Sequence, residues 1–191
     1  MKPERLTAFT DGVVAIIITI MVLELKVPAS AGPQALLQLA PTLGIYVLSF
    51  IFVGIYWNNH HHLFQAVTAV SGMTLWANLH LLFWLSLIPF ATEWMGHSQF
   101  ASLPVAFYGV LLIMSGVAWS LMTRTLLALH PTDSALHQAL GTDRKGMLSV
   151  VLYMLALALT PLSHYVSLAL YAVVALFWLV PDRRLERILA G

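Results

Sequence analysis

Long apolar runs dominate the chain, and short polar stretches separate them. A helix needs about 20 residues to cross the hydrocarbon core of a lipid bilayer. Runs of roughly this length lie at 6–25, 41–62, 72–94, 101–123, 147–163 and 164–181. The pattern predicts six membrane-spanning helices, and therefore an all-α polytopic membrane protein.

The boundary between the last two runs is the weakest part of this pattern. Only a short polar stretch around Thr160, Pro161 and Ser163 separates them. A proline there could also kink one long helix, so a five-span protein is the alternative. The stretch 26–40, which contains Pro28, Gly32 and Pro33, is predicted to be a simple connector.

The basic residues favour six spans. In that arrangement eight of the nine lysines and arginines lie on one side, and only Lys26 lies on the other. Loops rich in lysine and arginine stay in the cytoplasm, so both termini are predicted to be cytoplasmic. A five-span arrangement would place Arg183, Arg184 and Arg187 outside.

Composition supports a membrane protein and excludes several other classes. The chain is 60% hydrophobic and 9% charged, with a mean hydropathy of +0.85, whereas about 25% of residues are charged in soluble domains. It has no cysteine, which excludes disulfides, thiolate metal sites and cysteine nucleophiles. Its nine basic residues are scattered, unlike a nucleic-acid footprint, so neither a cofactor nor a nucleic-acid partner is expected.

The polar segments are too short to fold separately, which predicts one domain over 1–191. The longest of them, 124–146, is expected to be a cytoplasmic loop. A short helix through Leu140 is predicted within it, capped by Thr132 or Asp133 and ended by Gly141.

The first run carries a stripe of mostly branched apolar residues along one helical face. At roughly 100° per residue, the stripe occupies about one third of the circumference. Its members are Arg5, Gly12, Ile16, Thr19, Ile20, Leu23 and Val27. The stripe could pack against other helices of the same subunit, or several copies could face one another and line a pore.

Arg5 and Asp11 place opposite charges near the start of this run, where burying an unpaired charge is costly. Asp11 projects away from the stripe, and Arg5 lies on a different face from Asp11. We therefore expect the carboxylate to find its partner on another helix or subunit and to be structural. A proton or ion relay is the alternative.

Two further polar groups are predicted at the same depth. One is the stretch Trp57–Phe64 with three adjacent histidines, and the other is Asn78 in the third run. Adjacent helical residues point about 100° apart, so His60, His61 and His62 cannot share one metal ion, and no metal site is predicted. Either these groups form a buried network with Arg5 and Asp11, or they contact lipid headgroups separately.

The first half of the chain resembles the endosomal and lysosomal potassium-channel family, transmembrane protein 175, and its bacterial homologues. The family pattern is an arginine followed by Phe-Ser-Asp-Gly at the start of the first span, and Thr10 replaces the serine here. The matching residues are Arg5, Phe9, Thr10, Asp11, Gly12, Ala15, Ile16, Thr19, Leu23, Glu24, Trp57, His60, His61, Leu63, Phe64, Asn78, Leu85, Pro89 and Phe90. The second half is similar only in span count and hydropathy.

This resemblance implies a channel whose first helix lines the pore, without a glycine-rich filter loop. A single six-span repeat resembles the bacterial branch, which assembles as a tetramer. By position, Ile16, Ile20 and Leu23 match apolar constrictions, and Thr19 matches a hydroxyl layer linked to ion selection. The expected structural polar network consists of Arg5, Phe9, Thr10, Asp11, Trp57, His61 and Asn78.

We therefore expect a homotetrameric channel for potassium and other monovalent cations, embedded in a bacterial plasma membrane. A secondary transporter or a proton-permeable protein could instead use Arg5 and Asp11, although no inverted repeat is evident. A membrane enzyme would need a nucleophile–base pair or a metal cluster, and the histidines lack that spacing. A non-conducting scaffold is the remaining alternative.

Overall fold

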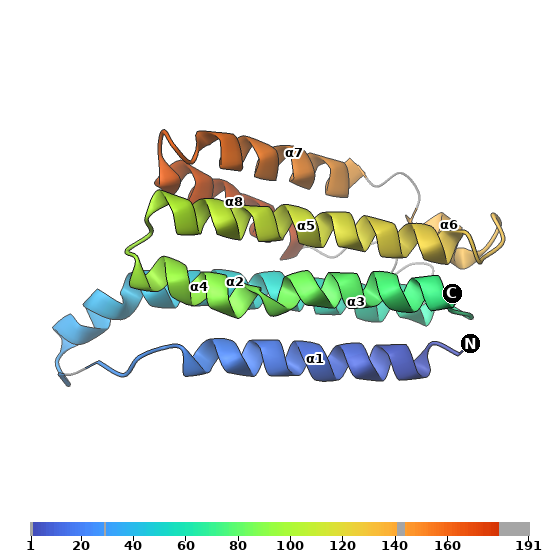
Figure 1. Cartoon of the computed structure of the whole chain (residues 1–191), viewed down its shortest axis with the longest axis horizontal. Coiled ribbons are helices and arrows are strands. Elements are labelled where there is room, and N and C mark those ends of the chain that lie inside the picture. The colour runs from blue at the N-terminus through green and yellow to red at the C-terminus, as the bar shows by residue number, and fades with distance from the viewer. Residues whose placement is uncertain (1, 29, 141–143, 180–191) are drawn as a thin grey trace.

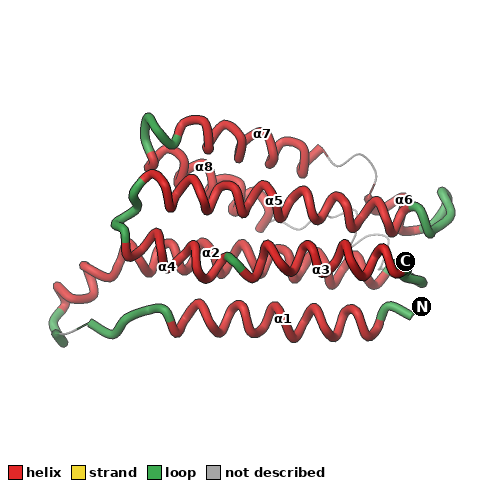
Figure 2. The backbone as a smooth tube through the Cα atoms, in the orientation of Figure 1, coloured by secondary structure: helices red, strands yellow, loops and turns green. Residues whose placement is uncertain are grey.

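The computed structural model describes residues 2–28, 30–140 and 144–179. Within these ranges the chain forms helices and loops but no strand (Figure 2). The helices are α1 (Glu4–Leu23), α2 (Pro33–Gln65), α3 (Gly72–Ser86), α4 (Ile88–His97), α5 (Ser102–Leu127), α6 (Ala135–Leu140), α7 (Arg144–Leu159) and α8 (His164–Leu179).

The long helices lie side by side in one bundle, with α1 at one edge and α7 at the opposite edge (Figure 1). α1 packs against α2, α3 and α4. α5 connects the two halves of the bundle, because it packs against α3 and α4 on one side and against α7 and α8 on the other. α1 thus has neighbours on one side only.

Among the described residues, four segments are long and apolar enough to cross a membrane: Glu4–Leu23, Pro33–Gln65, Gly72–His97 and Ser102–Leu127. α7 and α8 are apolar too, but each has only 16 residues. A turn at 160–163 separates them, so they are two helices rather than one helix kinked at Pro161. The six-span count remains a prediction for α7 and α8.

The predicted connector 26–40 was wrong in its second half, because α2 already begins at Pro33. A proline suits the first helical position, where its missing N–H would have had no partner. Pro41 then lies inside α2, where its ring removes a backbone hydrogen bond and bends a helix. Figure 1 shows the first turns of α2 diverging from the rest of the bundle.

The predicted run 72–94 forms one apolar segment that is interrupted at Leu87 (Figure 2). Pro89 follows two residues later and cannot donate a backbone hydrogen bond. The N–H of Leu87 instead bonds to the carbonyl of Trp84 at 3.3 Å, three residues back. α3 and α4 are therefore two helices, and both pack against α1.

Side chains and tight turns fix the helix ends. Ser71 caps α3 by accepting a hydrogen bond from the N–H of Thr74 at 3.2 Å. α6 is capped by Ser134, whose hydroxyl accepts from the N–H of His137 at 3.4 Å, rather than by Thr132 or Asp133. The predicted stop at Gly141 lies outside the described residues.

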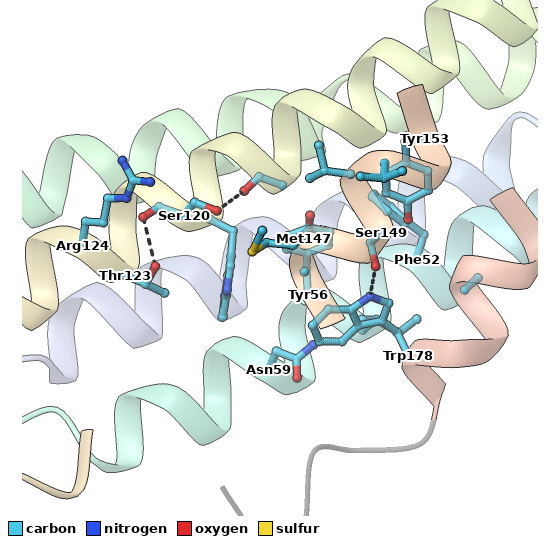
Figure 3. A pocket seen from close by; sticks show the side chains of 17 residues that line it. Phe52, Tyr56, Asn59, Ser120, Thr123, Arg124, Met147, Ser149, Tyr153 and Trp178 are labelled. Atoms are coloured by element: carbon cyan, nitrogen blue, oxygen red, sulfur yellow. Dashed lines mark hydrogen bonds between the residues drawn. The ribbon is translucent and has the colours of Figure 1, made fainter. Parts of the chain in front are cut away.

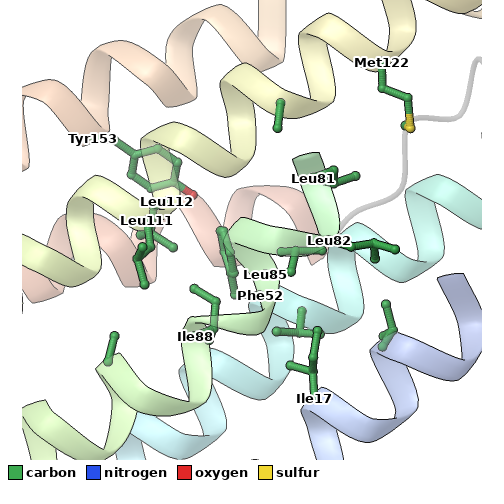
Figure 4. Packing of buried hydrophobic residues seen from close by; sticks show 14 of the residues in the cluster. Ile17, Phe52, Leu81, Leu82, Leu85, Ile88, Leu111, Leu112, Met122 and Tyr153 are labelled. Carbon is green, nitrogen blue, oxygen red and sulfur yellow. The ribbon is translucent and has the colours of Figure 1, made fainter. Parts of the chain in front are cut away.

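The core consists of aliphatic and aromatic side chains from all the long helices (Figure 4). Ile17 of α1, Phe52 of α2, Leu85 of α3 and Leu112 of α5 are each almost fully buried. One polar cluster lies within it: the Ser49 hydroxyl bonds to the hydroxyls of Thr92 at 2.7 Å and Tyr108 at 3.0 Å. These bonds satisfy groups that would otherwise be buried without partners.

Candidate functional site

The two faces of α1 differ sharply in burial. Leu6, Thr10, Val14, Ile17 and Met21 are buried against the bundle, and they recur every three or four residues. This spacing defines one face of a helix. The residues of the predicted stripe lie outside this buried set.

The stripe is exposed in the single chain. Ile16, Ile20 and Leu23 are 58%, 42% and 79% exposed, respectively. Thr19 between them is exposed as well, and its hydroxyl donates to the Ile16 carbonyl at 2.9 Å. The stripe therefore does not pack into the core of its own subunit, which was the alternative to pore lining.

A groove runs beside the stripe, between α1 and the α3–α4 break. Its volume is about 470 Å³, and Ile16 and Ile20 form part of its apolar wall together with Pro89 and Phe90. Two half-buried carboxylates, Glu24 and Glu93, also line it. The C-terminal end of the stripe therefore adjoins negative charge.

Behind the stripe, a buried polar network joins three helices. The Asn78 amide nitrogen donates to the Thr10 hydroxyl at 2.9 Å. The Asn78 amide oxygen lies 3.1 Å from Nε2 of His60, so with this amide orientation the imidazole donates through Nε2. Thr10, His60 and Asn78 are each 2% exposed. Directional bonds thus fix α1 relative to α2 and α3.

A second, more exposed contact joins α1 to α2. The indole N–H of Trp57 donates to a carboxylate oxygen of Asp11 at 2.9 Å. The Trp57 ring also stacks on His61, with centroids 5.9 Å apart. Asp11 thus has its partner on a neighbouring helix, as its projection from the sequence suggested.

The predicted network members do not all come together. Arg5 and Phe9 have exposed side chains on α1, and His61 bonds to Gln65 at 2.9 Å rather than to Asn78. The histidine that joins the buried network is His60, which was absent from the predicted set. The sequence feature that could have identified His60 is Phe64, an aromatic residue four positions later on the same helical face. The two rings stack, with their centroids 4.3 Å apart.

No group of three or more histidine, aspartate or glutamate side chains converges within the part of the chain that the structure describes. The polar groups of α1, α2 and α3 instead bond pairwise across helices. These bonds fix α1 relative to α2 and α3, and they leave the stripe of α1 exposed.

The chain is similar to known proteins over most of its length. A family model described as "Endosomal/lysosomal potassium channel TMEM175" matches residues 5–89. A potassium channel of Chryseobacterium sp. is 51% identical over 187 residues, which cover 98% of this chain and 97% of that protein. A potassium channel of Streptomyces collinus is 31% identical over 186 residues, covering 91% of this chain and 90% of that protein.

A solved structure is similar over nearly the whole chain. It is the crystal structure of a lysosomal potassium-selective channel TMEM175 homolog from Chamaesiphon minutus. It matches with a TM-score of 0.79 and 27% sequence identity, covering 93% of this chain and 96% of that one.

Proposed function

The chain belongs to the TMEM175 family of endosomal/lysosomal potassium channels, and on this premise we propose that it forms a homotetrameric, potassium-permeable channel whose pore is lined by α1. Its relatives are named as channels, and its apolar helices make it an integral membrane protein. The proposal assigns pore lining to Ile16, Thr19, Ile20 and Leu23.

The exposed stripe of α1 is the observation that carries this proposal. A surface that only contacts lipid tails needs no polar group, yet this one includes Thr19 and adjoins Glu24 in the neighbouring groove. Four copies around a common axis would cover the stripe and bring the four Thr19 hydroxyls together. α1 lies at the edge of its subunit (Figure 1), where such contacts between copies can form.

Apolar rings would then control hydration along the axis. From Ile16 to Leu23 the helix rises about 10 Å, which separates the three apolar layers by roughly one helical turn or less. Hydrophobic constrictions of this kind gate ions by excluding water. The Thr19 hydroxyl hydrogen already bonds to the Ile16 carbonyl, which leaves its oxygen lone pairs to act as cation ligands.

The contacts behind the stripe would keep these layers in register. A shift of α1 along its axis would break the Thr10–Asn78 and Asp11–Trp57 bonds together. We assign the network a structural role and not a role in coordinating the permeating ion. With the basic residues on one side, both termini face the cytoplasm of a bacterial cell.

Ion flux into liposomes tests the pore assignment. We expect Ile16→Ala to widen the constriction and raise potassium flux, because four smaller side chains leave a wider opening that admits more water. Val22→Ala is the matched control, since Val22 is an exposed aliphatic residue of α1 outside the stripe. Equal flux in the wild type and Ile16→Ala would falsify the role of Ile16.

The same liposomes separate a channel from a coupled transporter. A channel carries potassium and sodium down their gradients without a fixed proton stoichiometry. A proton dependence that Asp11→Asn abolishes would favour coupled transport instead. The mass of the assembly in the same preparation tests the tetramer.

A further inference from the structure

A cavity of about 530 Å³ lies on the α7 side of the bundle, among α2, α5, α7 and α8 (Figure 3). Volumes of roughly 300–1,000 Å³ are typical of ligand pockets. No residue of α1 lines this cavity. The ion pathway proposed above therefore does not use it.

The cavity has one apolar end and one polar end. Aromatic side chains, among them Phe52 and Tyr153, line the apolar end, while Thr123 and Arg124 lie toward the other, and Asn59 lies between the two ends (Figure 3). The lining residues of α5 extend from Gly116 to Arg124, a rise of about 12 Å. The two ends of the cavity therefore match the polar head and the apolar tail of an amphiphile that lies parallel to the helices.

Several polar groups of the wall are already satisfied by the protein. The Trp178 indole donates to the Ser149 hydroxyl at 2.8 Å, and the Ser120 hydroxyl donates to the Gly116 carbonyl at 3.0 Å. Both contacts are drawn in Figure 3. The middle of the wall thus presents mainly ring faces and aliphatic groups to an occupant.

The charge at the polar end is positive. The lining contains the Arg124 guanidinium and, among the described residues, no carboxylate. The Lys145 ammonium lies 4.6 Å from the centre of the Trp178 ring, which is part of the wall. An arginine guanidinium offers paired donors that suit a phosphate group.

The side of the cavity next to α7 is open to the surroundings. Met147 and Val151, one turn apart on α7, both line the cavity and are 72% and 62% exposed. In a membrane, large exposed apolar side chains at this position face lipid. An acyl chain can therefore enter from the bilayer between these residues.

We propose that this cavity binds an anionic phospholipid, with one acyl chain among the aromatic side chains and the phosphate at Arg124. Arg124 lies in the last turn of α5, and α5 ends on the same side of the bundle as the N-terminus (Figure 1). The phosphate at Arg124 therefore belongs to a lipid of the leaflet on that side. The site is separate from the proposed pore and does not depend on ion conduction.

Native mass spectrometry of the detergent-purified full chain tests this site. Phosphatidylglycerol and phosphatidylcholine with identical acyl chains are added in separate samples. We expect phosphatidylglycerol to be retained about tenfold better, because its headgroup has a net negative charge beside Arg124, whereas the choline ammonium compensates the phosphate of phosphatidylcholine. Arg124→Gln should reduce its retention to the level of phosphatidylcholine.

Filling the cavity tests the position of the acyl chain. A Cβ atom at Gly116 would lie 3.9 Å from both Tyr56 and Val150, which is ordinary contact. The remaining atoms of Gly116→Leu would enter the cavity, so both lipids should be lost. Gly44→Leu, whose Cβ meets nothing within 4 Å, is the matched control on α2.

A second filling variant, Val151→Trp at the exposed rim, covers the case in which Gly116→Leu does not fold. The proposal is overturned if the wild type retains both lipids equally, or if a folded filling variant retains as much phosphatidylglycerol as the wild type. Displacement by glycerol phosphate alone would also overturn it, because the site would then recognise a headgroup without a chain.

Discussion

Asn78 of α3 donates a hydrogen bond to the hydroxyl of Thr10 of α1 at 2.9 Å, and both side chains are almost fully buried. The same amide group bonds to His60 of α2 through its oxygen. One asparagine thus satisfies partners on two other helices. Losing it leaves two buried polar groups unpaired.

Asn78→Leu should therefore destabilise the protein by about 2–6 kcal/mol, because each of the two buried polar groups left without a partner costs roughly 1–3 kcal/mol. Unfolding in a titration with sodium dodecyl sulfate measures the change. Asn58→Leu is the control, because Asn58 is only half-buried and lies outside this network. Equal stability of the two variants would show that the network does not hold α1 in place.

Trp57→Phe removes the indole donor to Asp11 but keeps a ring that can stack on His61. Both partners are exposed, so we expect a loss of about 1 kcal/mol or less. Circular dichroism during thermal unfolding measures it. Trp76→Phe, at another exposed indole, should change stability less; a larger effect there would contradict a specific Asp11 contact.

Gly109→Ala should destabilise the core, because the new Cβ would overlap the hydroxyl of Tyr171. That tyrosine is 1% exposed, and its hydroxyl donates to the Val105 carbonyl at 3.3 Å, so it has little room to move. Overpacking of this kind costs about 1–3 kcal/mol. Denaturant unfolding provides the measurement.

The double variant Gly109→Ala with Tyr171→Phe tests the cause. Removing the hydroxyl removes the nearest atom, so the double variant should be more stable than the sum of the single changes predicts. Gly54→Ala, whose Cβ meets nothing within 4 Å, should be neutral or slightly stabilising. If the double variant loses as much stability as the two single variants together, the contact between the new Cβ atom and the Tyr171 hydroxyl is not the cause of the strain.

Thr19→Val keeps the shape of the side chain and removes its oxygen. If Thr19 contributes ligands to potassium in the tetramer, the ratio of potassium to sodium permeability should fall while assembly is unchanged. Reversal potentials in planar bilayers measure the ratio. Thr7→Val is the control on the same helix, because the Thr7 hydroxyl also bonds to a backbone carbonyl, that of Glu4 at 2.8 Å.

The partner of Asp11 could be placed on another helix or subunit from the sequence of α1, but whether the stripe packs into the same subunit could not be predicted. The five buried residues Leu6, Thr10, Val14, Ile17 and Met21 recur at helical spacing, and the stripe lies outside them. Asp11 projects away from the stripe, which predicted a partner on another helix or subunit, and Trp57 of α2 is that partner. The role of the stripe in conduction stays a prediction.

His60 and Tyr108 show why other parts of the site were not predictable. Neighbouring histidines differ by about 100° in direction, so choosing between His60 and His61 requires the rotation of α2, which its largely apolar sequence does not define. The Ser49–Tyr108 bond joins residues 59 positions apart on two helices that are apolar on most faces. Such helices carry no pattern that identifies their neighbours.

The hydrogen bonds from α1 to other helices are concentrated toward one end. Its described hydrogen bonds to other helices involve Thr10 and Asp11, whereas Ile20 lies beside a groove of about 470 Å³. The arm from Thr10 to Leu23 is about 20 Å long. Along this arm α1 is held by apolar contacts such as those of Ile17 and Met21, which have no fixed direction, so a tilt of a few degrees about the polar network would move Leu23 by about an ångström.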